Sequence, residues 1–259
     1  MVREPRRISR NRQQALIGLS LASAIFAAWL GVLGYALFAF DFSWGNAPFA
    51  IGIAALLCWL FVGLFIVSHD AMHGSLAPGM PRVNAAVGAT LLFLYAGFDW
   101  DKLKTAHFAH HKAPGTASDP DFAADHPEAF WPWYGVFLRR YFGWTSIVFV
   151  VAVFWICHLA FDVSVGKMLF FYALPSIASS IQLFYFGTYR PHRQGGEPFA
   201  DRHRARSDGF GSLASLASCY HFGYHHEHHC HPHTPWWALP AKRRAVAAER
   251  SLALDGARP

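Results

Sequence analysis

The sequence predicts an all-α integral membrane protein with about four transmembrane helices, one re-entrant or interfacial segment, and a cytosolic histidine-rich cap that holds a dimetal site. Three observations lead to this fold class. Hydrophobic residues make up 54% of the 259 residues and charged residues only 15%, unlike a soluble domain. Several apolar runs are long enough to cross a bilayer. The chain also carries 16 His, most of them in tight groups.

Four apolar runs have or approach the roughly 20 residues that an α-helix needs to cross the hydrocarbon core. They are residues 15–40, 49–68, 144–161 and 168–189. The last run contains Pro175, which a membrane helix tolerates. A fifth run, residues 83–98, is shorter and contains two glycines. We therefore predict that this fifth run is re-entrant or interfacial.

The positively charged residues predict the orientation, because loops rich in Lys and Arg stay in the cytoplasm. Residues 1–14 carry five Arg and are predicted to form a cytosolic amino-terminal segment. The linker 41–48 has no Lys or Arg and the linker 162–167 has one Lys, so both fit the outer side. The other loops are basic, and they share one side only if residues 83–98 do not cross. The sequence thus predicts a single membrane domain over residues 1–259, with every histidine group on the cytoplasmic face.

Charge and cysteine content exclude other classes of protein. The net charge of +6 comes from basic residues beside apolar segments, so the expected counter-charge is anionic lipid headgroups and not nucleic acid. The four Cys form no C-x-x-C motif, so neither a disulfide framework nor a zinc knuckle is expected. Residues 113–133 and 193–211 are rich in Gly, Pro, Asp and Ser, and are predicted loops.

Three histidine motifs predict a metal site. The second predicted span runs on into residues 69–73, where His69 and His73 share a helix face at i and i+4. The motif H-x-x-H-H then occurs twice, in residues 107–111 and again in residues 225–229. Eight imidazoles exceed the four ligands of one structural zinc site, so two metals are the natural count. Imidazole binds zinc, copper, iron and nickel, so the motifs leave the metal open.

Longer blocks around these motifs resemble a known family. They read SHDAMHGSLAPGMPRVNAAVGATLLFLYAGFDW, HFAHHKAPGTASDPDF, FGTYRPHR, DRHRARS and CYHFGYHHEHHCHPHTPWWALP. Over about residues 64–240 the chain resembles the bacterial β-carotene ketolases (carotenoid 4-ketolases) of the membrane fatty-acid desaturase and hydroxylase superfamily. The histidine spacings are shared across that superfamily, whereas the longer blocks are much more specific.

The resemblance implies a function and its cofactors. It implies a non-haem diiron centre with two Fe2+, O2 as oxidant and a ferredoxin-type electron donor. The expected substrate is a carotenoid whose β-ionone ring is oxidised at the C4 methylene to a ketone by two hydroxylations and loss of water. β-Carotene would give echinenone and canthaxanthin. The resemblance also implies a location in the bacterial inner membrane, with the active site on the cytoplasmic face.

The resemblance further implies which residues hold the metals. A histidine after the last span completes the ligand set in relatives, and His192 matches that position, with His203 as its competitor within the histidine-rich residues 192–233. The implied ligands are His69, His73, His107, His110, His111, His192, His225, His228 and His229. Residues expected beside the ligands, where they orient or surround the imidazoles, are Asp70, Asp119, Asp121, His203, His221, His226 and Glu227. The sequence identifies no substrate-binding residue. We expect Asp99 and Asp101 to cap the helix that carries the second motif.

Two alternatives use the same motifs. A fatty-acid desaturase, or an alkane or carotenoid hydroxylase, would apply the site to another substrate. A membrane metal transporter without redox activity would normally place ionisable residues at mid-membrane depth. The predicted spans contain almost none apart from His158, which favours chemistry at the membrane surface over passage through the bilayer.

Overall fold

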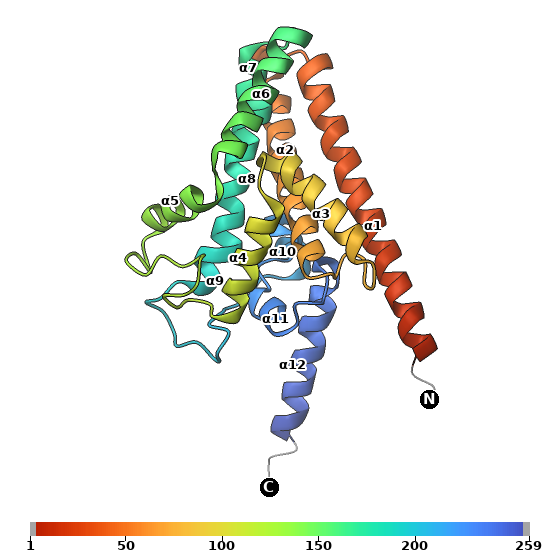
Figure 1. Cartoon of the computed structure of the whole chain (residues 1–259), viewed down its shortest axis with the longest axis vertical. Coiled ribbons are helices and arrows are strands. Elements are labelled where there is room, and N and C mark those ends of the chain that lie inside the picture. Colours follow the sequence, from red (N-terminus) through yellow and green to blue (C-terminus); the bar gives the residue numbers. More distant parts are fainter. Residues whose placement is uncertain (1–3, 256–259) are drawn as a thin grey trace.

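The computed structural model describes residues 4–255, which form helices and loops with no β-strand in that range. Four helical segments are long and apolar enough to cross a membrane, and this confirms the expected number. They run over Ile8–Ala39, Trp44–Met72, Trp144–Phe161 and Val165–His192. Figure 1 shows two loops at one end of the molecule. One joins α1 (Glu4–Gly34) to α2 (Ala47–Met72), and the other joins α6 (Trp144–Phe161) to α7 (Val165–Met168). The C-terminal helix α12 (Leu239–Asp255) and the start of α1 lie at the opposite end of the molecule.

The first span is α1 (Glu4–Gly34), which continues through a π-helical turn (Tyr35–Ala39). The helix begins at Glu4, so most of the basic stretch 1–14 forms its first turns, while residues 1–3 lie outside the described part. Ile25, Trp29 and Leu33 recur at a spacing of four and bury one face of the helix in the core. The opposite face is left for lipid.

The second span is α2 (Ala47–Met72), which follows a 3-10 turn (Trp44–Asn46) and has a proline in its first turn. Its second half is almost entirely buried, because four helices pack against α2. They are α1, α3 (Pro81–Ala96), α8 (Leu174–Phe184) and α10 (Ser212–Cys219). His73 caps its carboxyl end. The most enclosed helix of the bundle therefore delivers the first histidine motif.

The short apolar run expected to be re-entrant folds as α3 (Pro81–Ala96) and is followed by α4 (Trp100–Lys112) after a bend of 102°. Gly97 makes this bend at φ +66, and a side chain there would lie 2.6 Å from Cβ of Phe149. Asp99 caps α4 by accepting a hydrogen bond from the Lys102 N–H at 2.8 Å, as expected. Asp101 lies in the first turn. The bend aims α4, with the second histidine motif, at the end of α2.

Sequence analysis did not predict α5 (Phe130–Tyr141), whose first residues fall inside the expected loop 113–133. The helix is amphipathic: Trp133 and Tyr141 are buried, whereas Arg139 and Arg140 are exposed. Trp133 packs edge-on against Phe184 of α8 at 6.0 Å between ring centroids. Such a helix suits the membrane interface.

After α6 (Trp144–Phe161), the last span is one continuous helix from Val165 to His192, longer at both ends than the expected 168–189. It comprises α7 (Val165–Met168), a π-helical turn (Leu169–Ala173), α8 (Leu174–Phe184), a second π-helical turn (Tyr185–Tyr189) and α9 (Arg190–His192). Pro175 and Pro191 cannot donate a backbone hydrogen bond to the preceding turn, where the two π-helical turns lie.

The carboxyl-terminal part closes the bundle with short segments. They are α10, α11 (His225–Cys230), a 3-10 turn (Trp236–Ala238) and α12 (Leu239–Asp255). In Figure 1 α11 lies beside the lower ends of α4 and α9. The three histidine motifs are thereby brought to one end of the bundle.

Candidate metal centre

Nine imidazoles gather where the ends of α2, α4, α9 and α11 meet. They form two groups, and within each group one ring nitrogen of every histidine lies within 4.8 Å of the others. The five-imidazole group contains His69, His73, His107, His111 and His228, and the four-imidazole group contains His110, His192, His225 and His229. The rings of His111 and His229, one from each group, stack at 4.2 Å between centroids, so the two groups adjoin.

The repeated H-x-x-H-H motif supplies both groups at once. In α4 the first and last histidines of the motif join the five-imidazole group, whereas His110 joins the four-imidazole group. In α11 the first and last join the four-imidazole group, and His228 joins the other. Residues i and i+4 share a helix face, whereas neighbouring residues point about 100° apart. The adjacent pair that ends each motif therefore divides between the two groups.

The separations within each group suit a shared ion. Nε2 of His225 lies 3.0 Å from Nε2 of both His192 and His229, and Nε2 of His229 lies 3.3 Å from that of His110. Two Nε2 pairs in the five-imidazole group are 2.7 and 3.0 Å apart. Two nitrogens that bind one ion at about 2.1 Å and at right angles to each other lie about 3 Å apart.

Hydrogen bonds behind two of the rings determine which nitrogen faces the four-imidazole group. Nδ1 of His192 lies 2.7 Å from the backbone carbonyl of Arg204, and a carbonyl only accepts, so Nδ1 donates. In the neutral ring, Nε2 then carries the lone pair. The same holds for His110, whose Nδ1 donates to the carboxylate of Asp119 at 2.9 Å. A lone pair on the inward nitrogen is what a metal ion requires.

Other nitrogens in the groups have no hydrogen-bond partner. Within residues 4–255, Nε2 of His69 and Nδ1 of His225 and His229 are buried without one. An unpaired buried polar atom is uncommon and destabilising. An ion held by the five-imidazole group would satisfy Nε2 of His69. The donor set, the separations and this unpaired nitrogen all fit a bound metal.

Burial favours the neutral form of two imidazoles of α11, His228 and His229. The pKa values of His228 and His229 lie well below the ordinary value for histidine, because burial disfavours the charged ring and the neighbouring imidazoles repel it. Only a neutral imidazole can donate its lone pair to a metal. At neutral pH these two imidazoles therefore keep the lone pair that a metal requires.

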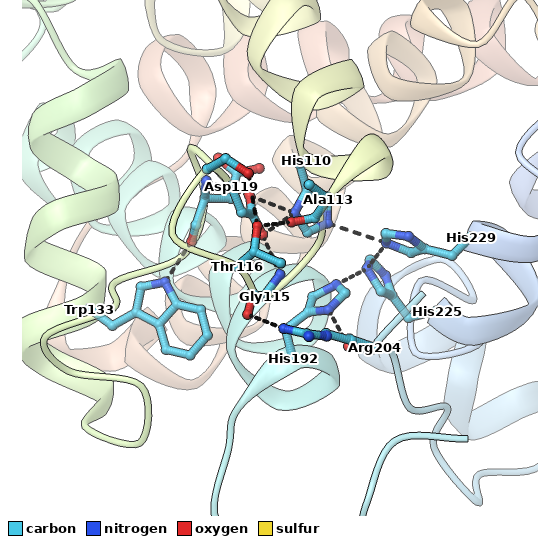
Figure 2. A network of polar contacts seen from close by, with 12 residues as sticks. His110, Ala113, Gly115, Thr116, Asp119, Trp133, His192, Arg204, His225 and His229 are labelled. Atoms are coloured by element: carbon cyan, nitrogen blue, oxygen red, sulfur yellow. Dashed lines mark hydrogen bonds and ion pairs between the residues drawn. The ribbon is translucent and has the colours of Figure 1, made fainter. Parts of the chain in front are cut away.

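Asp119 fixes the orientation of His110, as Figure 2 shows. Its carboxylate also accepts hydrogen bonds from the backbone N–H groups of Gly115 at 2.7 Å and Asp121 at 2.8 Å. Burial by itself raises the pKa of Asp119, but the hydrogen bond from His110 and those from the two amides lower it below the ordinary value. The carboxylate therefore stays ionised at neutral pH and makes His110 a stronger ligand for a metal ion.

Sequence analysis did not identify Arg204, which connects two parts of the site. Its carbonyl accepts the hydrogen bond from His192, and its Nη1 donates to the carbonyl of Gly115 at 3.0 Å (Figure 2). This links the segment after α4 to the end of the last span. A role carried by a backbone carbonyl leaves no signal in residue type, so only the DRHRARS block pointed to this segment.

Two residues expected beside the ligands, His203 and Asp70, make no side-chain hydrogen bond to either imidazole group within residues 4–255. The ring of His203 lies 6.2 Å from that of His229 between centroids, and His203 belongs to neither group. Of the two competing histidines, the structure brings in His192. Oδ1 of Asp70 lies 3.8 Å from Nδ1 of His69, too far for a hydrogen bond. The other oxygen of Asp70 accepts from the Trp236 N–H at 3.0 Å, which joins α2 to the carboxyl-terminal segment.

The remaining expected neighbours also have partners outside the two groups. His226 lies 2.8 Å from Asp201 and near Cys230. Glu227 accepts a hydrogen bond from Ser207 and lies 3.7 Å from Nε of Arg243. The ring of His221 is buried and stacks on Tyr224 at 5.7 Å. Asp121 accepts a hydrogen bond from the hydroxyl of Tyr141. These side chains anchor the segments that carry the imidazoles.

Comparison with known proteins identifies the family. Residues 42–147 and 130–254 match the family model described as Fatty acid desaturase. A β-carotene ketolase of Paracoccus sp. (strain PC1) is 45% identical over 230 residues, which cover 88% of this chain and 93% of the relative. The chain belongs to the β-carotene ketolase family. A zeaxanthin 4-ketolase of Chlamydomonas reinhardtii is 34% identical over 263 residues, 97% of this chain and 59% of that protein.

In this family member, a mostly apolar cavity of about 50 Å³ adjoins both imidazole groups. Its apolar lining comes from Phe65, Met72, Leu103, Phe137, Leu183 and Phe222. Asp121, Tyr141 and Thr188 add polar side chains. A whole carotenoid ring is larger than this void, so its entry requires bordering side chains such as the flexible Met72 to move. Apart from Asp121, which was expected beside the ligands, the sequence did not assign these residues to a cavity, because they come from four separate helices, the loop that carries Asp121 and the turn that carries Phe222.

Asp119→Asn is expected to lower metal retention by about 10- to 100-fold, because the neutral amide no longer strengthens His110 as a ligand. The measurement is the metal content of the purified protein, by mass spectrometry, after dialysis against a graded chelator. Asp201→Asn is the matched control, since Asp201 pairs with the outlying His226. Equal metal retention by Asp119→Asn and the unmodified chain would contradict the role given to Asp119.

Proposed function

We propose that the protein is a β-carotene 4-ketolase that converts the C4 methylene of carotenoid β-ionone rings to a ketone. β-Carotene then gives echinenone and, when both rings react, canthaxanthin. The observation that carries the proposal is a buried pair of imidazole groups beside an apolar cavity, in a chain 45% identical to a β-carotene ketolase. An apolar cavity suits a hydrocarbon substrate.

The nine imidazoles would hold two iron ions as Fe2+, the five-imidazole group one and the four-imidazole group the other. Bound iron supplies oxidising power with O2, which the C4 methylene requires because it has neither an acidic proton nor a leaving group. The chain contributes the rest. Asp119 and the carbonyl of Arg204 orient imidazoles, and the apolar walls of the cavity exclude water.

The overall reaction has three balanced steps. Each hydroxylation consumes one O2, two electrons and two protons, places one oxygen atom on C4 and releases the other as water. The resulting geminal diol then loses water to leave the ketone, with no further oxidant. The electrons come from a ferredoxin-type donor. The family match and the histidine groups support this redox assignment.

The protein is proposed to lie in the bacterial inner membrane with its site on the cytoplasmic face. Five Arg in the first fourteen residues support this orientation, since basic segments stay inside. In Figure 1 the helices α4, α9 and α11, which carry most of the imidazoles, lie toward the same end of the bundle as this basic start of α1. A soluble electron donor would therefore reach the site from the cytoplasm, while the carotenoid arrives from the lipid.

Expression in a bacterium that accumulates β-carotene tests the proposal. We expect echinenone and canthaxanthin to appear in pigment extracts, at levels that fall when iron or O2 is limited. Membranes with a reductant, supplied with carotenoids or with fatty-acyl and alkane substrates, separate the ketolase from a desaturase or alkane hydroxylase. Oxidation of acyl chains alone would refute the proposal. Metal uptake without O2 consumption would instead indicate a transporter.

A further inference from the structure

The cavity beside the two imidazole groups contains polar side chains that a hydrocarbon substrate cannot use. Tyr141 donates its hydroxyl to the carboxylate of Asp121, and Thr188 borders the same cavity from the π-helical turn Tyr185–Tyr189. A β-carotene ring has no group that could bond to them. Each of these side chains turns hydrogen-bonding capacity beyond its present bond toward an otherwise apolar cavity, which is costly to leave unused, so their presence indicates a ligand that carries oxygen.

The polar pair lies next to the four-imidazole group and is held rigidly. A carboxylate oxygen of Asp121 lies within 4.8 Å of a ring nitrogen of His110. The Asp121 N–H donates to Asp119 at 2.8 Å, and its carbonyl accepts from the indole N–H of Trp133 at 2.6 Å. Tyr141 is only 7% exposed. The pair therefore forms a fixed polar edge of the cavity beside the proposed metal site.

The Asp121 carboxylate and the Tyr141 oxygen can each accept further hydrogen bonds. An ionised carboxylate offers about four acceptor sites, of which Tyr141 takes one, and the tyrosine oxygen can itself accept. A hydroxyl group on the ring could donate to the carboxylate and accept from Thr188. The void of about 50 Å³ exceeds the space that one water needs, so a hydroxyl fits in it.

We infer that Asp121, Tyr141 and Thr188 bind the oxygen that the first oxidation places on C4, and so hold the half-oxidised ring for the second oxidation. The inference rests on the proposed ketolase function. The three residues act as positioning residues for the intermediate: they leave the first hydroxylation of the hydrocarbon unaided and prevent the alcohol from leaving early. The released product is then the ketone.

The decisive variant makes this edge apolar while keeping the number and branching of side-chain heavy atoms at residue 121, by combining Asp121→Leu with Tyr141→Phe. Replacing both partners of a buried hydrogen bond together avoids leaving one unpaired. We expect the ratio of 4-hydroxy to 4-keto end groups in the pigment to rise about tenfold, the effect of losing one hydrogen bond to a charged group. The total number of oxidised rings should change much less.

Tyr134→Phe with Ser180→Ala is the matched control. It removes a similar hydrogen bond, of 2.9 Å, between α5 and α8, and neither residue lines the cavity. This control should keep the unmodified ratio of alcohol to ketone. A raised ratio in the control would overturn the inference, because general loosening of α5 would then explain the effect.

Thr188→Val keeps the test decisive if the double variant is inactive. It removes one hydroxyl at nearly constant volume, and it too should raise the ratio of alcohol to ketone. An unchanged ratio in Thr188→Val together with an inactive or unchanged double variant overturns the inference. So does a raised ratio that appears only with 3-hydroxylated rings, since the edge would then recognise an oxygen already on the substrate. If the unmodified chain oxidises no ring at all, it is the proposed function that fails.

Discussion

His228→Ala is expected to abolish ketone formation while the protein remains inserted in the membrane. His228 lies in the five-imidazole group, with its Nε2 3.0 Å from that of His111 and its ring 4.5 Å from that of His69 between centroids. Removing a residue behind a ligand costs 10- to 100-fold, so loss of a ligand should cost more than about 100-fold. Pigment analysis in a β-carotene-producing host measures the effect. His110→Ala should have the same result through the other group.

The control for these variants is His126→Ala, because His126 is exposed and belongs to neither group. It should form ketone at the unmodified level. Membrane fractionation and the bound metal content separate loss of the site from loss of the protein. We expect His228→Ala in the membrane fraction, since the spans pack through apolar side chains such as Trp29 and Phe61, away from the imidazoles. Normal ketone formation by His228→Ala would refute its role as a ligand.

The transmembrane helices could be predicted because their signal is local. A run such as residues 144–161 contains no Asp, Glu, Lys or Arg, and lipid requires no more than length and hydrophobicity. The cap at Asp99 is equally local, because it involves a hydrogen bond three residues along the chain. By contrast, α5 was missed: its amphipathic sequence includes Pro132, and its burial depends on contacts with α8.

For the candidate site, the sequence predicted which histidines take part but not how they divide between the two groups. Spacing indicated that eight histidines act together and the family resemblance added His192, and the structure brings all nine into two groups. Spacing alone could not assign His110 and His228 to the opposite group from the other histidines of their motifs. That assignment depends on how α4 and α11 face each other. The sequence favoured His192 over His203, and in the structure His192 reaches the four-imidazole group because the last helix continues to it and the carbonyl of Arg204 lies behind its ring.

Gly187→Ala is expected to lower ketone formation about 10- to 100-fold without removing any polar group. A side chain at Gly187 would press against Phe222, whose Cδ1 would lie 2.8 Å from the added Cβ. Phe222 cannot yield freely, because its ring packs on His69 at 4.8 Å and on His225 at 5.1 Å between centroids. Such overpacking costs about 1–3 kcal/mol, and here the displacement is transmitted to both imidazole groups and to the cavity.

A second substitution tests whether steric pressure is the cause. Phe222→Leu shortens the obstructing side chain, so Gly187→Ala combined with Phe222→Leu should recover part of the lost ketone formation, although Phe222→Leu alone lowers it. Gly52→Ala in α2 should be silent, because a Cβ there meets nothing within 4 Å. If the double variant is no more active than Gly187→Ala alone, the pressure does not pass through Phe222. The small residue at 187 would then have to act through the backbone of the π-helical turn itself.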